Sequence, residues 1–257
     1  MVRIPQHNPA DESLEKAVKD FETHGCIYLT ELRPVDRVRA MRKQFAELYE
    51  VRKDDHVYQL VSRERRIYSP QLEGEFADSD LYAHPWVMQF MERLLGKEFV
   101  LGNLTSVTSF PGAIDQHRHR DCPGLFGTNY DYFTPSFGIN LFIPLVDLNA
   151  EIGSTRMWPG THRRPVPDEE AVKGGFVEPE VAVGDALLMD YRLLHQGMAN
   201  QTDQVRPLIC LGYQRPWFLD TVNFFHGNSI NLSDEQYEQI DPDHQHLFAR
   251  VKMKIRG

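Results

Sequence analysis

Two short stretches of this sequence carry residues that can bind a metal. The first, Gln116–Asp121, reads Gln-His-Arg-His-Arg-Asp, and the second begins at His195. A His-x-Asp pair, here His119 and Asp121, joined by one distant His is the ligand set that holds iron(II) on one triangular face and leaves the opposite face open. Strand residues two positions apart point to the same side, so one ion can meet both members of the pair. We therefore predict that His119, Asp121 and His195 are the metal ligands and the catalytic residues.

A second metal arrangement stays open at this point. His117 and His119 have the same two-residue spacing, so a three-histidine site of the cupin type is an alternative. A lone His-x-Asp pattern also arises by chance in chains rich in histidine, and this chain has 11 histidines. We prefer His119 and Asp121 as ligands and interpret His117 as a neighbour of the site or a surface residue.

Arg206 is a candidate cation beside the metal that could bind a carboxylate. It lies eleven residues after His195 and directly precedes Pro207, at the start of a predicted strand. An Arg that faces inward binds a carboxylate through two parallel hydrogen bonds of fixed geometry. Iron with open positions beside such a clamp indicates an oxygenase that uses a small diacid as cosubstrate. The alternative is an ordinary Arg at the exposed edge of a strand.

The elements that must position these residues change in character along the chain. Up to about residue 97 the pattern is mainly helical, with one short strand at 26–29, and residues 52–80 are ambiguous. From about 98 to 218, short strands alternate with turn signals, which is typical of a sandwich or jelly roll. The predicted strands are 99–110, 136–145, 154–158, 186–190 and 207–215. The tail, 219–257, again reads as helical.

These patterns predict a single α+β domain over residues 1–257. Its core is a double-stranded β-helix (a cupin-like jelly roll), on which the helical N-terminal segment packs. The metal ligands follow strands, so they would lie at one mouth of the barrel, where a rigid scaffold holds side chains from distant parts of the chain.

Composition excludes several classes of partner. The chain has 257 residues, 41% of them hydrophobic and 25% charged, and a formal net charge of -9. Nucleic acid and anionic membranes require clustered Lys and Arg, so neither is expected as a partner. We find no signal peptide and no run of about 18 apolar residues that would span a membrane. The cysteines are few and widely spaced, which favours a reducing cytoplasm; they are Cys26, Cys122 and Cys210.

Residues 99–218 resemble the phytanoyl-CoA dioxygenase superfamily of iron(II)- and 2-oxoglutarate-dependent oxygenases, and look closest to members that tailor natural products. The resemblance rests on motifs that occur in the family's order. They are Gln116-x-x-His119-x-Asp121, the Gly-Ser-Thr-Arg-Met-Trp-Pro-Gly-Thr-His run from Gly153 to His162, the segment from Gly184 to His195, Arg206, and Arg215-Pro216-Trp217-Phe218.

The resemblance implies that the three predicted ligands bind iron and that Arg206 pairs with the distal carboxylate of 2-oxoglutarate. Gln116 and Thr155 occupy positions that hydrogen-bond the cosubstrate in similar enzymes. Asn140, on a strand that crosses the site, can do the same, unless it is a solvent-facing strand residue. Iron(II), 2-oxoglutarate and O2 are thus the implied cofactors.

Three details refine this expectation. A Ser that often assists the Arg in the family is replaced by Gly197, so a water or Thr155 would take over its hydrogen bond. Related halogenases lack the Asp, because chloride takes its place on iron; Asp121 therefore favours hydroxylation or another oxidation. The Gly-, Pro- and aromatic-rich segment 122–135 is interpreted as a lid or substrate wall, with a packed surface loop as the alternative.

The sequence thus predicts an oxygenase of secondary metabolism that oxidises a small molecule and releases succinate and CO2. Two rivals remain: a cupin-like metalloenzyme that uses no 2-oxoglutarate, and a non-catalytic binding protein on the same scaffold. No motif selects the substrate, the position that is oxidised or the oligomeric state.

Overall fold

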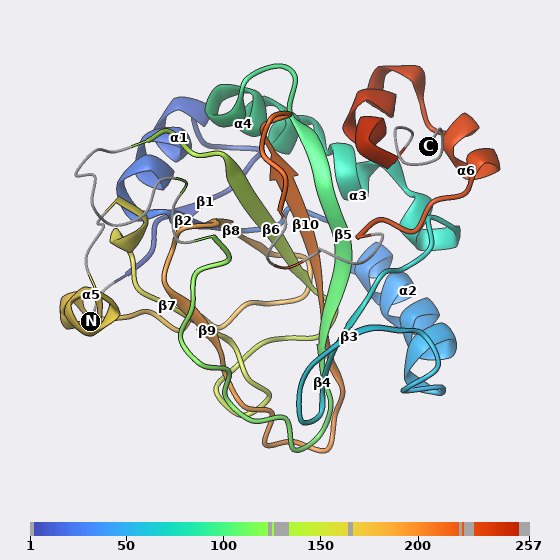
Figure 1. The fold of residues 1–257 in the computed structure, drawn as a ribbon, viewed down its shortest axis with the longest axis horizontal. Coiled ribbons are helices and arrows are strands. Elements are labelled where there is room, and N and C mark those ends of the chain that lie inside the picture. The colour runs from blue at the N-terminus through green and yellow to red at the C-terminus, as the bar shows by residue number, and fades with distance from the viewer. Residues whose placement is uncertain are drawn as a thin grey trace.

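The computed structural model describes residues 3–122, 125, 134–163, 167–220, 223 and 229–251. Its centre is an eight-stranded sheet, crossed by a smaller sheet of two strands (Figure 1). In spatial order the large sheet contains β1 (Gln6–His7), β2 (Cys26–Leu29), β8 (Ala186–Asp190), β6 (Gly138–Pro144), β10 (Arg206–Gln214), β5 (Val100–Ser109), β4 (Arg65–Tyr68) and β3 (Val57–Ser62). The small sheet pairs β7 (Thr155–Met157) with β9 (His195–Gly197). Apart from the parallel β1–β2 pair, the named strands pair antiparallel.

The central strands β6, β8 and β10 of the large sheet are buried on both faces. Successive residues of a strand point to opposite sides, so each face contributes to a different core. On β10, Ile209 and Leu211 join the main hydrophobic core, whereas Leu208 and Cys210 join a second core on the other face. Met157 of β7 belongs to this second core. The cavity described below therefore opens on the face that looks toward the small sheet.

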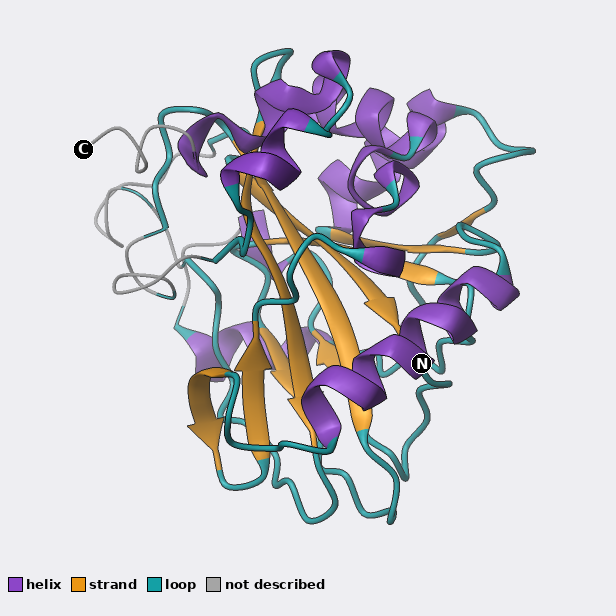
Figure 2. Cartoon of the chain, turned by 90° about the vertical axis from the view of Figure 1, so that its right-hand side faces the viewer, coloured by secondary structure: helices purple, strands orange, loops and turns teal. Residues whose placement is uncertain are grey.

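Helices cover the opposite face of the large sheet (Figure 2). They are α1 (Leu14–His24), α2 (Val35–Phe45), α3 (Ser79–Ala83) and α4 (Pro85–Leu95). Their apolar stripes pack on the outward residues of the strands, and Phe21 of α1 meets Phe90 of α4 edge to face. Burying such stripes is what holds short helices in place. The site thus rests on a sheet backed by a continuous layer of helices.

The C-terminal segment adds α6 (Asp234–Glu238) and the 3-10 helix η5 (Pro242–Phe248) beside α3 (Figure 1). Phe248 packs edge to face on Tyr82 of α3. Ser233 begins α6 with a capping box, in which its side chain and that of Gln236 satisfy each other's backbone N–H groups. No helix within the described ranges has the length and apolar character that crossing a bilayer requires.

The structure confirms the predicted α+β class with a jelly-roll core. Each predicted strand of the 99–215 region is present, with ends shifted by one or two residues. In the N-terminal part, β2 confirms the strand predicted at 26–29, whereas β1, β3 and β4 were not predicted; the four together supply half of the large sheet. The ambiguous stretch 52–80 contains β3 and β4; β4 begins with Arg65 and Arg66, whose charges do not predict the buried strand that they form. The division of the chain into three parts stays a prediction.

Candidate metal centre and its cavity

Three of the predicted residues converge on one point. Ligand atoms of His119, Asp121 and His195 all lie within 4.8 Å of one another. The Oδ1 atom of Asp121 is 3.9 Å from Nε2 of His119 and 3.7 Å from Nε2 of His195. The convergence has a backbone cause: His119 and His195 exchange both N–H···O bonds across an isolated bridge that extends the small sheet. His119 and His195, 76 positions apart in sequence, are thereby held on one ladder.

The two imidazoles are oriented by the backbone. Nδ1 of His119 lies 2.9 Å from the carbonyl oxygen of His117, and Nδ1 of His195 lies 3.0 Å from that of Leu193. A carbonyl only accepts, so Nδ1 carries the proton in each ring and Nε2 presents its lone pair to the common point. A metal-binding histidine is usually fixed by a partner of this kind on its other nitrogen. The donor set therefore fits a divalent metal.

Electrostatics support the same conclusion. Burial, with the charge of neighbouring His195 as a second cause, lowers the pKa of His119 to about 4. Burial also lowers the pKa of His195 to about 4. Burial raises the pKa of Asp121 to about 6. At neutral pH the site therefore holds two neutral imidazoles and a carboxylate, the protonation states that bind a metal.

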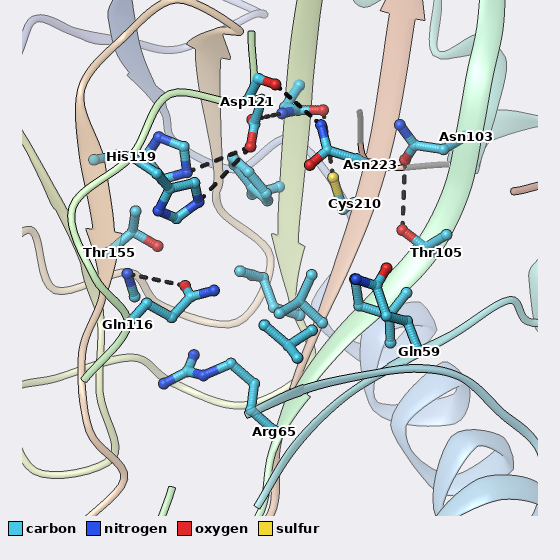
Figure 3. A pocket seen from close by; sticks show the side chains of 18 of the residues that line it. Gln59, Arg65, Asn103, Thr105, Gln116, His119, Asp121, Thr155, Cys210 and Asn223 are labelled. Atoms are coloured by element: carbon cyan, nitrogen blue, oxygen red, sulfur yellow. Dashed lines mark hydrogen bonds and ion pairs between the residues drawn. The ribbon is translucent and has the colours of Figure 1, made fainter. Parts of the chain in front are cut away.

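These groups line a cavity of about 370 Å³ between the two sheets. Figure 3 shows His119 and Asp121 at one end and Arg65 at the other, with Gln116 and Thr155 between them. Inward residues of neighbouring strands form the opposite wall, among them Val107, Phe142 and Leu208. The cavity therefore has a metal end and an arginine end.

Two buried arginines occupy the arginine end. Arg206 of β10 and Arg65 of β4 both pair in register with Ser109, one from each side of β5. Arg206 donates to the Ser109 hydroxyl at 2.8 Å, while its Nε has no partner among the described residues. Arg65 donates from Nη2 to two backbone oxygens, and its Nε and Nη1 have no partner in the same part of the chain. Within the described residues, no carboxylate lies within ion-pair distance of either guanidinium.

Burial is the largest influence on both of these cations. It lowers the pKa of Arg206 to about 9, helped by the charge of Arg65. It lowers the pKa of Arg65 to about 10. Both groups stay charged at neutral pH, and a buried charge without a partner is costly. The arrangement fits an anion that enters the cavity and supplies the missing acceptors. Sequence reasoning missed Arg65, because it lies in the ambiguous stretch before the predicted core.

The predicted residues between the two ends also face the cavity. The Oε1 atom of Gln116 accepts a hydrogen bond of 3.1 Å from the Gly197 N–H, which leaves Nε2 without a bond to a described residue. Thr155 is buried, lines the cavity and makes no side-chain hydrogen bond to the described chain. The close packing around residue 197 explains why it is glycine: a Cβ there would lie 2.3 Å from Gln116 Oε1 and 2.8 Å from Arg65 Nη1.

Asn140 reaches the cavity from β6, but its amide is engaged at the metal end. Its Nδ2 donates to Oδ2 of Asp121 at 2.7 Å. The alternative of a solvent-facing residue is wrong, because Asn140 is 4% exposed. Its assignment as a cosubstrate ligand stays a prediction.

The Gly-Ser-Thr-Arg run acts behind the site and braces the loop that carries His195. The Thr161 hydroxyl accepts from the backbone N–H of Leu194, and the Trp158 N–H donates to the Leu194 carbonyl. Gly153, at φ 91°, lies where a Cβ would come within 2.6 Å of the Met198 and Ala199 carbonyls. The motif therefore fixes the position of β9 and contributes Thr155 to the cavity.

His117 is not one of the converging ligands. It lines the cavity, with its ring centroid 5.2 Å from that of His119, but it is absent from the group of ligand atoms in the described part of the chain. This favours the His-Asp-His set over the three-histidine alternative. The predicted lid, 122–135, lies mostly outside the described residues.

Comparison with known proteins identifies the family. The phytanoyl-CoA dioxygenase (PhyH) family profile matches residues 21–208, and the chain belongs to this family. Among curated relatives, it is 31% identical over 146 residues to the Fe(II)/2-oxoglutarate-dependent dioxygenase nvfF of Aspergillus novofumigatus, which covers 54% of this chain and 47% of the relative. It is 25% identical over 225 residues to the multifunctional dioxygenase ausE of Penicillium brasilianum, covering 79% and 73%. The chain spans about half the length of the first curated relatives that it matches.

Solved structures share the fold. HygX from Streptomyces hygroscopicus, determined with nickel, 2-oxoglutarate and hygromycin B, aligns with a TM-score of 0.63 and 18% identity over 80% of this chain and 88% of its own. The epimerase SnoN from nogalamycin biosynthesis, in complex with Fe3+, α-ketoglutarate and nogalamycin RO, aligns with a TM-score of 0.61 and 17% identity, over 79% and 83%. At this identity the likeness shows the fold alone. The cofactor expectation of iron and 2-oxoglutarate is confirmed at the level of the family.

Proposed function

We propose that this chain is an iron(II)- and 2-oxoglutarate-dependent oxygenase that oxidises a small molecule and releases succinate and CO2. One observation carries the proposal: a preformed His-Asp-His ligand set shares a cavity with buried arginines that have no carboxylate partner among the described residues. A binding protein on a degenerate scaffold has no reason to keep both. A cupin-like enzyme without 2-oxoglutarate has no reason to bury Arg206 unpaired.

We assign the metal to His119, Asp121 and His195. Iron(II) bound there would supply the activation of O2 and the oxidation of an unactivated C–H bond. The protein's own part is to hold three ligands on one face and leave the other face open toward the cavity. Both imidazoles are already locked through Nδ1, so little reorganisation is needed when the metal binds.

We assign the distal carboxylate of 2-oxoglutarate to the arginine end. Arg206 lies in the wall of the cavity, and Arg65 lies beside it across Ser109. A carboxylate placed there gains charge-assisted hydrogen bonds, and it also relieves the cost of two buried unpaired cations. The free Nε2 of Gln116 and the Thr155 hydroxyl are positioned to hold the cosubstrate between the clamp and the metal.

The remaining wall is apolar. Val107, Phe142 and Leu208, from three neighbouring strands, line the cavity. In a cavity with such a wall, hydrogen bonds and charges act more strongly than in water, and the oxidising centre is shielded from unproductive quenching. The protein thus contributes orientation and exclusion of solvent.

We propose a natural product of small size as the substrate. Relatives with dioxygenase activity come from fungi, and the structural neighbours bind hygromycin B and nogalamycin RO. Asp121 fills the ligand position, which favours an oxidation over halogenation. A cytoplasmic location also stays part of the proposal, and three buried cysteines that form no disulfide among the described residues fit a reducing compartment.

Substrate-stimulated succinate formation tests the proposal. The purified protein, loaded with iron(II) under reducing conditions, is offered 2-oxoglutarate with a panel of neutral, cationic and acyl-CoA compounds. We expect one iron per chain and succinate release that depends on 2-oxoglutarate and rises with a member of the panel. A protein that binds no iron would favour the binding-protein rival. Turnover without 2-oxoglutarate would favour the cupin-like rival.

A further inference from the structure

Asn140 makes a single strong contact at the metal end that the roles proposed above leave unexplained. Its Nδ2 donates to Oδ2 of Asp121 at 2.7 Å. We propose that Asn140 is a positioning residue, which occupies one carboxylate oxygen of Asp121 so that the other alone binds the metal. This inference rests on the proposed function, since it assumes that Asp121 is a metal ligand.

The orientation of the Asn140 amide follows from its two neighbours. An ionised carboxylate only accepts, so the NH2 group, and not the carbonyl, must face Asp121. The other side of the amide is held as well: the Cys210 thiol lies 3.4 Å from Asn140 Oδ1 and donates to it. All of this lies on rigid strands, since Asn140 and Phe142 share the inward face of β6 while Cys210 lies on neighbouring β10. The amide is thus fixed at both ends.

The consequence for Asp121 is geometric. With Oδ2 engaged by Asn140, only Oδ1 faces Nε2 of His119 and of His195, at 3.9 and 3.7 Å. A carboxylate free to rotate can bind a metal through both oxygens and thereby take a further position on the ion. In this enzyme class the open positions must receive the cosubstrate and O2. Asn140 therefore keeps these coordination positions free of a second Asp121 oxygen.

The same contact supports Asp121 as a ligand, because the Asn140 amide donates to the carboxylate oxygen that faces away from the two histidines. A donor to a ligating carboxylate strengthens metal binding, and loss of such a partner typically costs about 10- to 100-fold in metal affinity.

Cobalt(II) titration of the intact chain tests the inference without any turnover. Visible absorption of bound cobalt reports both affinity and ligand geometry. We expect Asn140→Leu to weaken cobalt binding by about 10- to 100-fold and to change the absorption spectrum. Asn103→Leu is the matched control: Asn103 is also a buried strand residue in the cavity wall, but it donates to Tyr191 and not to a metal ligand. The control should keep the affinity of the wild type.

A second pair of variants separates positioning from packing. Cys210→Ala removes the donor that holds the Asn140 carbonyl, and Cys210→Ser restores one. We expect a smaller loss of cobalt affinity in the first and recovery in the second. If Asn140→Leu does not fold, Asn140→Ser takes its place, because its side chain is too short to reach Asp121. Wild-type affinity and spectrum in a folded Asn140 variant would overturn the inference. A wild-type chain that binds no cobalt would instead overturn the proposed function.

Discussion

The two ends of the cavity are built on opposite principles. At the metal end, each atom that does not face the metal point has a partner in the protein: both Nδ1 atoms meet carbonyls, and Asp121 Oδ2 meets Asn140. At the arginine end, N–H groups of Arg65 and Arg206 are buried and find no acceptor within the described ranges. One end is finished by the chain itself, and the other is complete only with an anion.

This difference bears on how each end tolerates change. A group that the protein already satisfies is rigid, and losing one member leaves its partners buried and unpaired. A group that waits for a ligand costs stability while it is empty, because the cation is desolvated without compensation. Substitutions at the metal end should therefore remove function and leave buried partners unpaired. Substitutions at the arginine end should remove function but increase the stability of the ligand-free protein.

The largest expected effect comes from the metal end. Asp121→Ala should abolish stoichiometric iron binding and lower substrate-dependent succinate formation by about 10³-fold or more, since metal catalysis supplies several kcal/mol. Metal content and succinate release are the measurements. His117→Ala is the control, because His117 lies in the wall but outside the ligand group. If the Asp121→Ala protein still bound one iron tightly, Asp121 would not be a metal ligand and the metal end would not be the site described above.

Arg206→Met should raise the 2-oxoglutarate concentration for half-maximal rate by about 100-fold, because two charge-assisted hydrogen bonds contribute about 3 kcal/mol. Iron affinity should stay unchanged. Without 2-oxoglutarate, the variant should unfold at the same or a higher temperature than the wild type, since a buried unpaired cation has been removed.

Arg33→Met is the counterpart of Arg206→Met in stability measurements. Arg33 is equally buried, but it forms ion pairs with Asp78 and Asp80 at 3.0 and 3.1 Å. Its replacement should lower the unfolding temperature. If thermal unfolding of the two variants shifts in the same direction, the arginine end is not a site that waits for an anion.

Gly197→Ser should have a smaller effect at the junction of the two ends. Its Cβ would come within 2.3 Å of Gln116 Oε1 and 2.8 Å of Arg65 Nη1, so both side chains must move. We expect the requirement for 2-oxoglutarate to rise by about 10-fold with little change in iron affinity, the size of effect that modest overpacking produces. Gly174→Ser, with no atom within 4 Å of its Cβ, is the control. An unchanged requirement in Gly197→Ser would place Gln116 and Arg65 outside the cosubstrate site.

The same contrast explains what the sequence could reveal. His119 and Asp121 are two residues apart, so their spacing can be read from the sequence without knowledge of the fold. Arg206 could be predicted for a similar reason, because it lies a short distance after His195 in the sequence. Arg65 was not, since its closeness to Arg206 arises only when β4 and β10 pair with β5 from either side.

Asn140 shows a further limit of sequence reasoning. Alternation along β6 predicts that its side chain points inward or outward, and a strand buried on both faces leaves the two directions indistinguishable. Its contact with Asp121 depends on where the segment after β5 returns across the sheet. The position of a strand residue was thus predictable, while the identity of its partner required the fold.

An unsatisfied nitrogen outside the cavity sharpens the comparison. His162 is buried behind the site; its Nε2 donates to the Glu22 carbonyl at 3.1 Å, and its Nδ1 has no partner in the portion of the chain that the structure describes. Burial lowers its pKa from 6.5 to about 4. Between these values the unfolded chain binds a proton that the folded chain does not, so the free energy of unfolding should fall as the pH falls from 6.5 toward 4.

His162→Gln should reduce that slope by up to about 1.4 kcal/mol per pH unit. Urea unfolding of both metal-free proteins at several pH values measures the difference, in which the other titrating groups cancel. Equal slopes would mean that burial does not lower the pKa of His162. A buried nitrogen without a partner would then not imply a cost in stability at the arginine end either.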